Sequence, residues 1–176
     1  ITKTTSTGWG NSGASSSLKS PANGSVEFTV PQTTNYAMVG LSTTDPNTSY
    51  TSIQFAIYSN KGTVGVYESG TSRGSFGTYA AGTTFSVERV GTKIYYKKNG
   101  VAFYTSTLTS SGSLLADAAL YSQGATISDA KITGVVIKEP DAITTLAANS
   151  DDGQVVLSWS VPKDNGSPIA SYEVQY

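Results

Sequence analysis

The sequence predicts an all-β protein built as a two-sheet antiparallel sandwich, and three observations predict it. Thr, Ser, Gly, Tyr and Val dominate the 176 residues, which is the composition of half-buried strands and their turns. About ten short segments between residues 25 and 138 carry the apolar and polar patterning of strands. Asn99-Gly100 joins two of these segments, and this dipeptide is the strongest short-range signal for a β-hairpin.

The hairpin at residues 92–104 predicts a turn, a register and two faces. A type I′ turn needs positive φ at both central residues, which Asn and Gly tolerate best. The predicted cross-strand pairs are Lys98 with Val101, Lys97 with Ala102, Tyr96 with Phe103 and Tyr95 with Tyr104. Alternation then turns Ile94, Tyr96, Val101 and Phe103 to the core, and Tyr95 and Tyr104 to the outer face.

The other strands follow in chain order from the same patterning. Residues 1–24 form a polar lead with Trp9, which we expect to dock onto an edge of the core, with ligand contact as the alternative. The Gly-rich residues 69–82 predict a connection, and residues 114–121 a strand with Asp117 facing out. The remaining predicted strands are residues 25–30, 35–41, 52–58, 63–68, 83–90 and 128–138.

Charge and missing residue types exclude several classes of function. Charged residues are 13% of the chain and the formal net charge is −1, so there is no basic field to hold nucleic acid. The chain has no Cys and no His, which removes disulfides, thiolate metal sites and imidazole bases. No run approaches the roughly 18 apolar residues of a membrane span, so we expect no membrane insertion.

The carboxylates are too scattered to predict an enzyme. A glycoside hydrolase needs two carboxyl groups about 5 to 10 Å apart. The single carboxylates of Glu27, Glu68, Glu88, Asp117 and Asp129 fall on separate predicted strands, and we expect them to be outward and solvated. No enzyme and no cofactor are therefore expected.

A calcium site at Asp45 and Asn47 is a weaker prediction. Their loop supplies one carboxylate and one amide, which falls short of the about 6 to 8 oxygen ligands that calcium takes. We expect a turn at this loop instead.

Four tyrosines are the candidate ligand-binding residues. Tyr58, Tyr67, Tyr95 and Tyr104 all fall opposite the predicted core faces and form one aromatic patch if their strands share a sheet. Sugars stack on such rings, and Gln54 and Lys93 can hydrogen-bond their hydroxyl groups. The alternative is that these tyrosines only cover strands or pack under a loop.

The character of the sequence changes at residues 139–141, which we assign as a linker between residues 1–138 and 142–176. Residues 142–148, 154–161 and 171–176, with Asp152-Gly153 and Trp159, resemble the first three strands of a fibronectin type III domain. The resemblance implies a truncated domain, because the complete fold has seven strands in roughly 100 residues. Two interpretations are open: the segment packs on its neighbour as a fragment end, or another chain completes it by strand addition.

Residues 25–138 resemble a concanavalin A-like, more loosely SPRY-like, jelly-roll module of large bacterial surface and secreted proteins. The residues that carry the resemblance are 39–42, 50–58, 66–70, 95–100, 103–106 and 119–126. The resemblance implies an extracellular adhesion or glycan-recognition module beside fibronectin type III domains. It transfers no ligand residues, because the metal-binding cluster of legume-type lectins has no counterpart in this chain.

The sequence therefore predicts a non-catalytic adhesion or carbohydrate-binding module, extracellular, secreted or on a cell surface. Its expected partners are a glycan or surface protein, neighbouring domains, or copies of itself. The alternative is a structural or self-assembling subunit completed by strand addition at the C-terminal segment.

Overall fold

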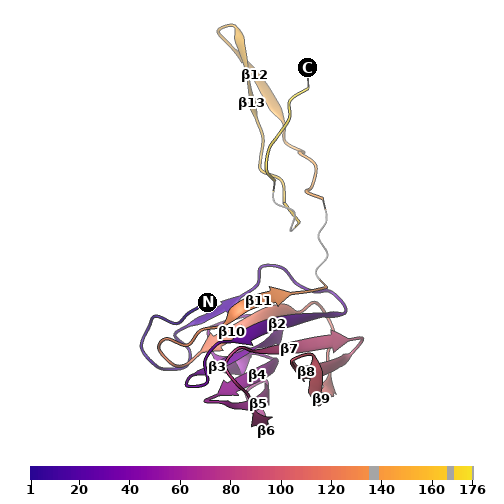
Figure 1. Cartoon of the computed structure of the whole chain (residues 1–176). Helices are drawn as coiled ribbons and strands as arrows, with labels where there is room; N and C mark the ends of the chain where they lie inside the picture. Colours follow the sequence, from indigo (N-terminus) through magenta and orange to yellow (C-terminus); the bar gives the residue numbers. More distant parts are fainter. Residues whose placement is uncertain (135–138, 166–168, 176) are drawn as a thin grey trace. The chain divides into compact units, whose positions relative to one another are not determined.

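The computed structural model describes residues 1–134, 139–165 and 169–175, and it confirms the all-β prediction (Figure 1). Two antiparallel sheets form a jelly-roll sandwich, and a separate two-stranded hairpin follows. The chain divides into two compact units, Ile1–Val135 and Val136–Tyr176. Among the described residues, no helix is long and apolar enough to cross a membrane.

The larger sheet of the first unit has six strands in the order β1-β10-β3-β4-β5-β6. A short 3-10 helix, η1 (Tyr50–Ser52), precedes its strand β4. The strands are β1 (Gly13–Ser15), β3 (Tyr36–Ser42), β4 (Phe55–Asn60), β5 (Thr63–Glu68), β6 (Thr71–Thr78) and β10 (Leu115–Leu120).

Strand β6 corrects the prediction that residues 69–82 form only a connection. Gly74 and Gly77 adopt φ angles of 119° and 88°, which glycine reaches without a steric penalty. The pairing register between β5 and β6 shifts at two places, so the sequence of β6 does not show the regular alternation of a strand. Backbone pairing with β5, rather than strand propensity, makes this edge strand.

The second sheet has five strands in the order β11-β2-β7-β8-β9. They are β2 (Gly24–Val30), β7 (Thr83–Val90), β8 (Lys93–Lys98), β9 (Val101–Thr109) and β11 (Ser128–Ile132). Residues 135–138, the end of the last predicted strand, lie outside the described residues.

The core lies between the two sheets, where the inward faces of their strands meet. Phe28, Phe85, Leu41 and Ile57 are each at most 1% exposed. Arg89, on the inward side of β7, is 2% exposed and donates hydrogen bonds to the backbone oxygens of Ala22 and Gly112. Burial lowers the pKa of this guanidinium, and the carbonyl groups supply the partners that a buried charge needs.

The β8–β9 hairpin confirms the predicted turn and corrects the predicted register. Asn99 and Gly100 have φ angles of 49° and 80°, as a type I′ turn requires, and Lys97 pairs with Ala102. One residue further the register shifts, so that Tyr96 faces Tyr104 and Tyr95 faces Thr105. Phe103 is therefore the extra residue of a β-bulge, which moves Tyr104 and Thr105 to the faces opposite to those predicted, and the register shifts again before Thr109.

The inward face of the hairpin is confirmed on β8 and differs from the prediction at Val101 of β9. Ile94 and Tyr96 are buried as predicted. Val101 is 71% exposed, so its predicted place in the core is wrong. It lies beside the turn on the outermost strand of the sheet, where nothing covers it.

The second unit contains one hairpin, β12 (Ala147–Asp151) and β13 (Gln154–Ser158), in its described part. The first strand was predicted at residues 142–148 and overlaps β12 only at residues 147 and 148. Residues 171–175, predicted as a third strand, form none; a strand needs a neighbour for its backbone groups, and the described chain offers these residues no ladder. Tyr176 lies outside the described residues.

The rings of Trp159 and Tyr172 pack against each other in the second unit, with centroids 5.0 Å apart. The assignment of residues 142–176 to a fibronectin type III segment, with residues 139–141 as linker, stays a prediction.

Candidate functional site

The four candidate tyrosines lie in two different sheets. Tyr58 on β4 and Tyr67 on β5 belong to the six-stranded sheet, whereas Tyr95 on β8 and Tyr104 on β9 belong to the five-stranded sheet. The predicted single patch is therefore wrong. Its physical basis was a shared sheet, and the chain crosses from one sheet to the other between β6 and β7.

Tyr104 is a core residue rather than an outward one. The bulge at Phe103 turns its ring toward Tyr96, with centroids 5.5 Å apart, and toward Phe76 on β6 at 4.9 Å. These rings close the sandwich where the edge strands β6 and β9 meet. Tyr95 remains outward and half-buried, with no aromatic neighbour among the described rings.

The two polar candidates are also separated. The side-chain oxygen of Gln54 accepts a hydrogen bond of 3.0 Å from the backbone N–H of Thr43, which fixes the connection before β4. Lys93 is exposed at the start of β8, in the other sheet. Gln54 thus has a structural partner already, and Lys93 lies in a different sheet from Tyr58 and Tyr67.

Tyr58 and Tyr67 instead join four aromatic residues that the prediction did not group with them. We name the set the outer aromatic cluster; it lies on the outer face of the six-stranded sheet. Ring centroids of neighbouring members are 4.9 to 6.1 Å apart. Its members are Trp9, Tyr36, Tyr50, Tyr58, Tyr67 and Tyr121.

Strand alternation explains why the cluster forms. Tyr36 and Met38 on β3 point to the outer face, while Ala37 and Val39 belong to the main core. Gly65 lies opposite Tyr58 across the β4–β5 ladder, and a side chain there would come within 3.7 Å of the tyrosine. A small second core of Met38, Ile53, Ala56 and Ala119 lies beneath the rings.

The N-terminal lead holds Trp9 on this cluster. Lys3, 1% exposed, donates hydrogen bonds from Nζ to the backbone oxygens of Gly8 at 2.6 Å and Leu120 at 2.9 Å, and to the Asn11 side chain. The Thr48 hydroxyl donates to the Gly10 oxygen at 2.7 Å. The prediction that Trp9 docks onto an edge of the core is confirmed, since it packs on Tyr50, Tyr58 and Tyr121.

The electrostatics of the cluster act on the Tyr58 hydroxyl. Burial, together with the neighbouring tyrosines, raises the pKa of Tyr58 to about 12, so this hydroxyl is neutral at physiological pH. The Lys61 ammonium lies 5.0 Å from the centre of the Tyr36 ring, in a cation–π contact. The cluster therefore offers aromatic faces, the neutral Tyr58 hydroxyl as donor and acceptor, and the positive charge of Lys61.

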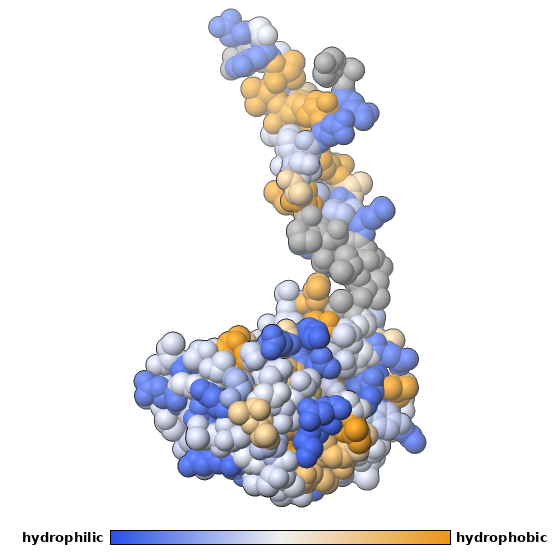
Figure 2. All heavy atoms as spheres, viewed as in Figure 1, coloured by the Kyte–Doolittle hydropathy of each residue, from blue (hydrophilic) through white to orange (hydrophobic). Residues whose placement is uncertain are grey.

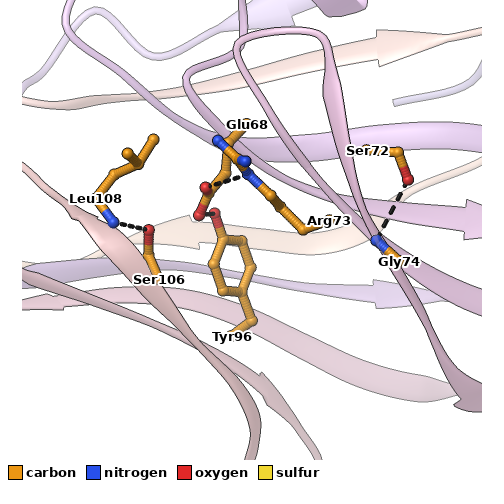
Figure 3. Close-up of polar contacts among 7 residues, drawn as sticks. All are labelled: Glu68, Ser72, Arg73, Gly74, Tyr96, Ser106 and Leu108. Atoms are coloured by element: carbon orange, nitrogen blue, oxygen red, sulfur yellow. Dashed lines mark hydrogen bonds and ion pairs between the residues drawn. The ribbon is translucent and has the colours of Figure 1, made fainter.

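Two of the five carboxylates predicted as solvated are buried. Glu68 is 1% exposed, and it accepts hydrogen bonds from Arg73 Nε at 2.7 Å and from the Tyr96 hydroxyl at 3.0 Å (Figure 3). The prediction for Glu68 is wrong because alternation places it inward with Val64 and Val66 on β5. The alternation of Val64, Val66 and Glu68 in the sequence already indicates that Glu68 faces inward.

Asp117 lies on the outer face of β10, as predicted, but it is only 3% exposed. Its Oδ2 accepts a hydrogen bond of 3.0 Å from the Ser42 hydroxyl. Burial raises the pKa of this carboxyl to about 6, which outweighs the lowering by Ser42.

The other three carboxylates lie at exposed or partly exposed positions. Glu27 Oε1 forms an ion pair of 3.0 Å with Lys131 Nζ, and Glu88 Oε2 one of 2.5 Å with Lys97 Nζ. Asp129 is exposed. The part of the chain that the structure describes contains no group of three or more acidic side chains able to hold a metal ion.

The loop at Asp45 and Asn47 forms a turn. Asn47 Oδ1 accepts a hydrogen bond of 2.9 Å from the Ser49 N–H, and both Asp45 and Asn47 are exposed. One oxygen of the proposed calcium pair is thus already used to close the turn.

Sequence reasoning missed Tyr36, Tyr50 and Tyr121 as members of the site. The signal for Tyr36 was its alternation with Ala37 on β3. Tyr50 and Tyr121 lie just outside strands, in η1 and after β10, where periodicity gives no direction. The order of the strands in the sheet was needed to bring them together.

Comparisons with known proteins found likenesses of fold. No family model and no curated protein sequence matches the chain. Among solved structures, the alginate lyase AlgAT5 from Polysaccharide Lyase family 7 aligns over 68% of this chain and 62% of its own, with 17% identity and a TM-score of 0.44. A toad ovary galectin in complex with thio-digalactose aligns over 69% of this chain and 98% of its own, with 10% identity and a TM-score of 0.44.

The galectin LEC-6 of Caenorhabditis elegans aligns over 69% of this chain and 94% of its own, with 12% identity and a TM-score of 0.38. This chain thus spans about three fifths of the alginate lyase it resembles.

Proposed function

We propose that this chain is a non-catalytic carbohydrate-binding module of an extracellular or cell-surface protein, and that the outer aromatic cluster holds the sugar. The observation that carries the proposal is the gathering of six half-buried aromatic rings on one outer face of the six-stranded sheet. A rigid group of rings stacks against the C–H faces of sugars, and few side-chain rotamers are lost on binding.

The polar groups of the cluster suit the same ligand. The pKa of the Tyr58 hydroxyl is about 12, so at neutral pH it keeps its proton and can both donate to and accept from sugar hydroxyl groups. Lys61 adds a donor beside Tyr36. The buried carboxylates support a binding role over hydrolysis, because Glu68 is bonded to Arg73 and Tyr96, and Asp117 to Ser42.

A glycan array followed by calorimetry tests this proposal. Tyr36→Ala and Tyr121→Ala, made separately, remove rings from the cluster, and we expect each to weaken binding of an array-positive glycan at least tenfold. Tyr95→Ala is the matched control, because Tyr95 is a half-buried outward tyrosine in the other sheet. A blank array, or equal binding by all three variants, contradicts the proposal.

A second candidate function, a structural or self-assembling role, is favoured by the second unit. Figure 2 shows apolar side chains gathered along the β12–β13 hairpin. Val155, Val161 and Val174 are 65%, 78% and 58% exposed. A two-stranded hairpin is marginally stable by itself in water, so its open edges and apolar side chains favour an added strand.

Light scattering of the full chain over a concentration series tests this second role. We expect association that weakens in Val155→Lys, while Thr107→Lys on the exposed part of β9 leaves it unchanged. A monomer at all concentrations contradicts self-assembly and leaves the carbohydrate proposal untouched.

A further inference from the structure

A cavity of about 230 Å³ lies inside the first unit, between the two sheets of the sandwich. Its lining comes from β1, β10 and Val39 of β3 in one sheet, from β2 and β11 of the other, and from Ile1 and Ile127 outside the strands. This is the opposite edge of the sandwich from β6 and β9, where Phe76 and Tyr104 fill the gap. The cavity is therefore separate from the outer aromatic cluster.

Small side chains explain why the sheets leave this space. The edge strand β1 has the sequence Gly-Ala-Ser, and β10 turns Ala116 and Ala118 toward the interior. At the other edge, aromatic rings occupy the corresponding positions. Apolar walls that face water are unfavourable, so an apolar ligand that covers them gains binding free energy.

The chemistry changes from the floor of the cavity to its mouth. The floor consists of Val26, Val39 and Ile127, which are 1%, 3% and 1% exposed. The exposed lining residues are on the solvent side and include Ser15, Ala130 and Lys131. The cavity thus opens to solvent between β1 and β11, with an apolar interior and a rim on which Ser15 and Lys131 are polar and Ile1, Ala14 and Ala130 are apolar.

The charged side chains near the cavity already have partners, and the Ile1 ammonium donates a hydrogen bond of 2.7 Å to the Ile127 backbone oxygen. Lys131 forms an ion pair of 3.0 Å with Glu27. The Asp117 carboxylate accepts from Ser42 and faces the outer side of β10, while its neighbours Ala116 and Ala118 face inward. No unpaired charge among these groups therefore selects an ionic ligand.

We propose that this cavity is a binding site for a neutral amphiphile with a short aliphatic tail. The tail lies against Val26, Val39 and Ile127, and a hydroxyl head lies at the rim beside Ser15. An apolar protein cavity of about 150 Å³ accommodates benzene, so this one takes a tail of about six carbon atoms or slightly more. The site is independent of the carbohydrate proposal.

Titration of the full chain with 1-hexanol, followed by amide chemical shifts in NMR spectra, tests the proposal. We expect saturable shifts confined to β1, β2, β10 and β11 and to the lining residues Ile1, Val39 and Ile127. Ala118→Leu fills the cavity and should weaken the binding of 1-hexanol at least tenfold. Ala102→Leu is the matched control on the exposed part of β9 and should bind as the wild type does.

A second variant keeps the test decisive if Ala118→Leu does not fold. Val39→Ala enlarges the floor, and we expect it to shift the preference from 1-hexanol toward 1-octanol. Shifts that do not saturate, shifts centred away from the residues that line the cavity, or equal binding by Ala118→Leu and the wild type overturn the proposal.

Discussion

The Tyr96 hydroxyl donates a hydrogen bond of 3.0 Å to the Glu68 carboxylate, and this bond joins β8 of one sheet to β5 of the other. Both residues are at most 1% exposed, and Arg73 Nε is the second partner of the carboxylate at 2.7 Å (Figure 3). Burial, followed by the nearby Glu68 charge, raises the pKa of Tyr96, so its hydroxyl remains a donor. The sandwich is thus joined across its interior by a charge-assisted hydrogen bond.

Tyr96→Phe should lower the free energy of unfolding by about 1 to 3 kcal/mol, because it leaves a buried carboxylate with one partner fewer. Urea unfolding measures the change. Tyr95→Phe, one residue away and outward, is the control and should change stability by less than about 0.5 kcal/mol. Equal stability of the two variants would contradict the structural importance of the Tyr96–Glu68 bond.

Asp117 should make stability fall as the pH rises. Its pKa is about 6 in the folded chain and 3.8 as the ordinary value, so the folded state holds the proton more tightly. The contribution is favourable at low pH, declines between about pH 4 and 6, and is constant above that range.

Asp117→Asn should remove this decline, because Asn stays neutral and can still accept from Ser42. The variant should gain stability relative to the wild type with rising pH, by at most about 3 kcal/mol for a shift of roughly two pKa units. Thermal unfolding between pH 4 and 7.5 measures the difference. A stability difference between Asp117→Asn and the wild type that does not change with pH contradicts the raised pKa of Asp117.

Replacing glycine by alanine should lower the free energy of unfolding by very different amounts at Gly40 and Gly100. A Cβ at Gly40 on β3 would lie 1.8 Å from the Phe55 backbone oxygen, so Gly40→Ala has to displace β4. Gly100 has open space, and Gly100→Ala meets only the strain of φ 80° in the turn. We expect about 1 kcal/mol for Gly100→Ala and clearly more for Gly40→Ala. Urea unfolding of both variants checks the ranking, and the reverse order would contradict it.

Local sequence signals predicted most of the fold. The Asn99-Gly100 turn and the alternating strands depend on neighbouring residues, so they could be identified without the structure. Alternation also placed Glu68 inward with Val64 and Val66, although we predicted it as solvated. Strand β6 could not be predicted because pairing with β5, and not its own Gly-rich sequence, makes it a strand.

The candidate site depended on facts that no local pattern contains. Tyr58 and Tyr95 looked equivalent, since both are tyrosines opposite a core face, but strand order places them in different sheets. The bulge at Phe103 turns Tyr104 to the face opposite to the predicted one. The alternating sequence of the hairpin does not indicate where a bulge occurs. Trp9 reaches the cluster across a long sequence separation, through the anchoring of its segment by Lys3.

Trp9 fluorescence tests the central claim most directly, because Trp9 belongs to the outer aromatic cluster. The chain has two tryptophans, and Trp159→Phe leaves Trp9 as the only one. Titration of this variant with an array-positive glycan should give a saturable change in emission, with the same affinity that calorimetry measures. Glycan binding in calorimetry without any change in Trp9 emission would contradict the placement of the sugar on the outer aromatic cluster.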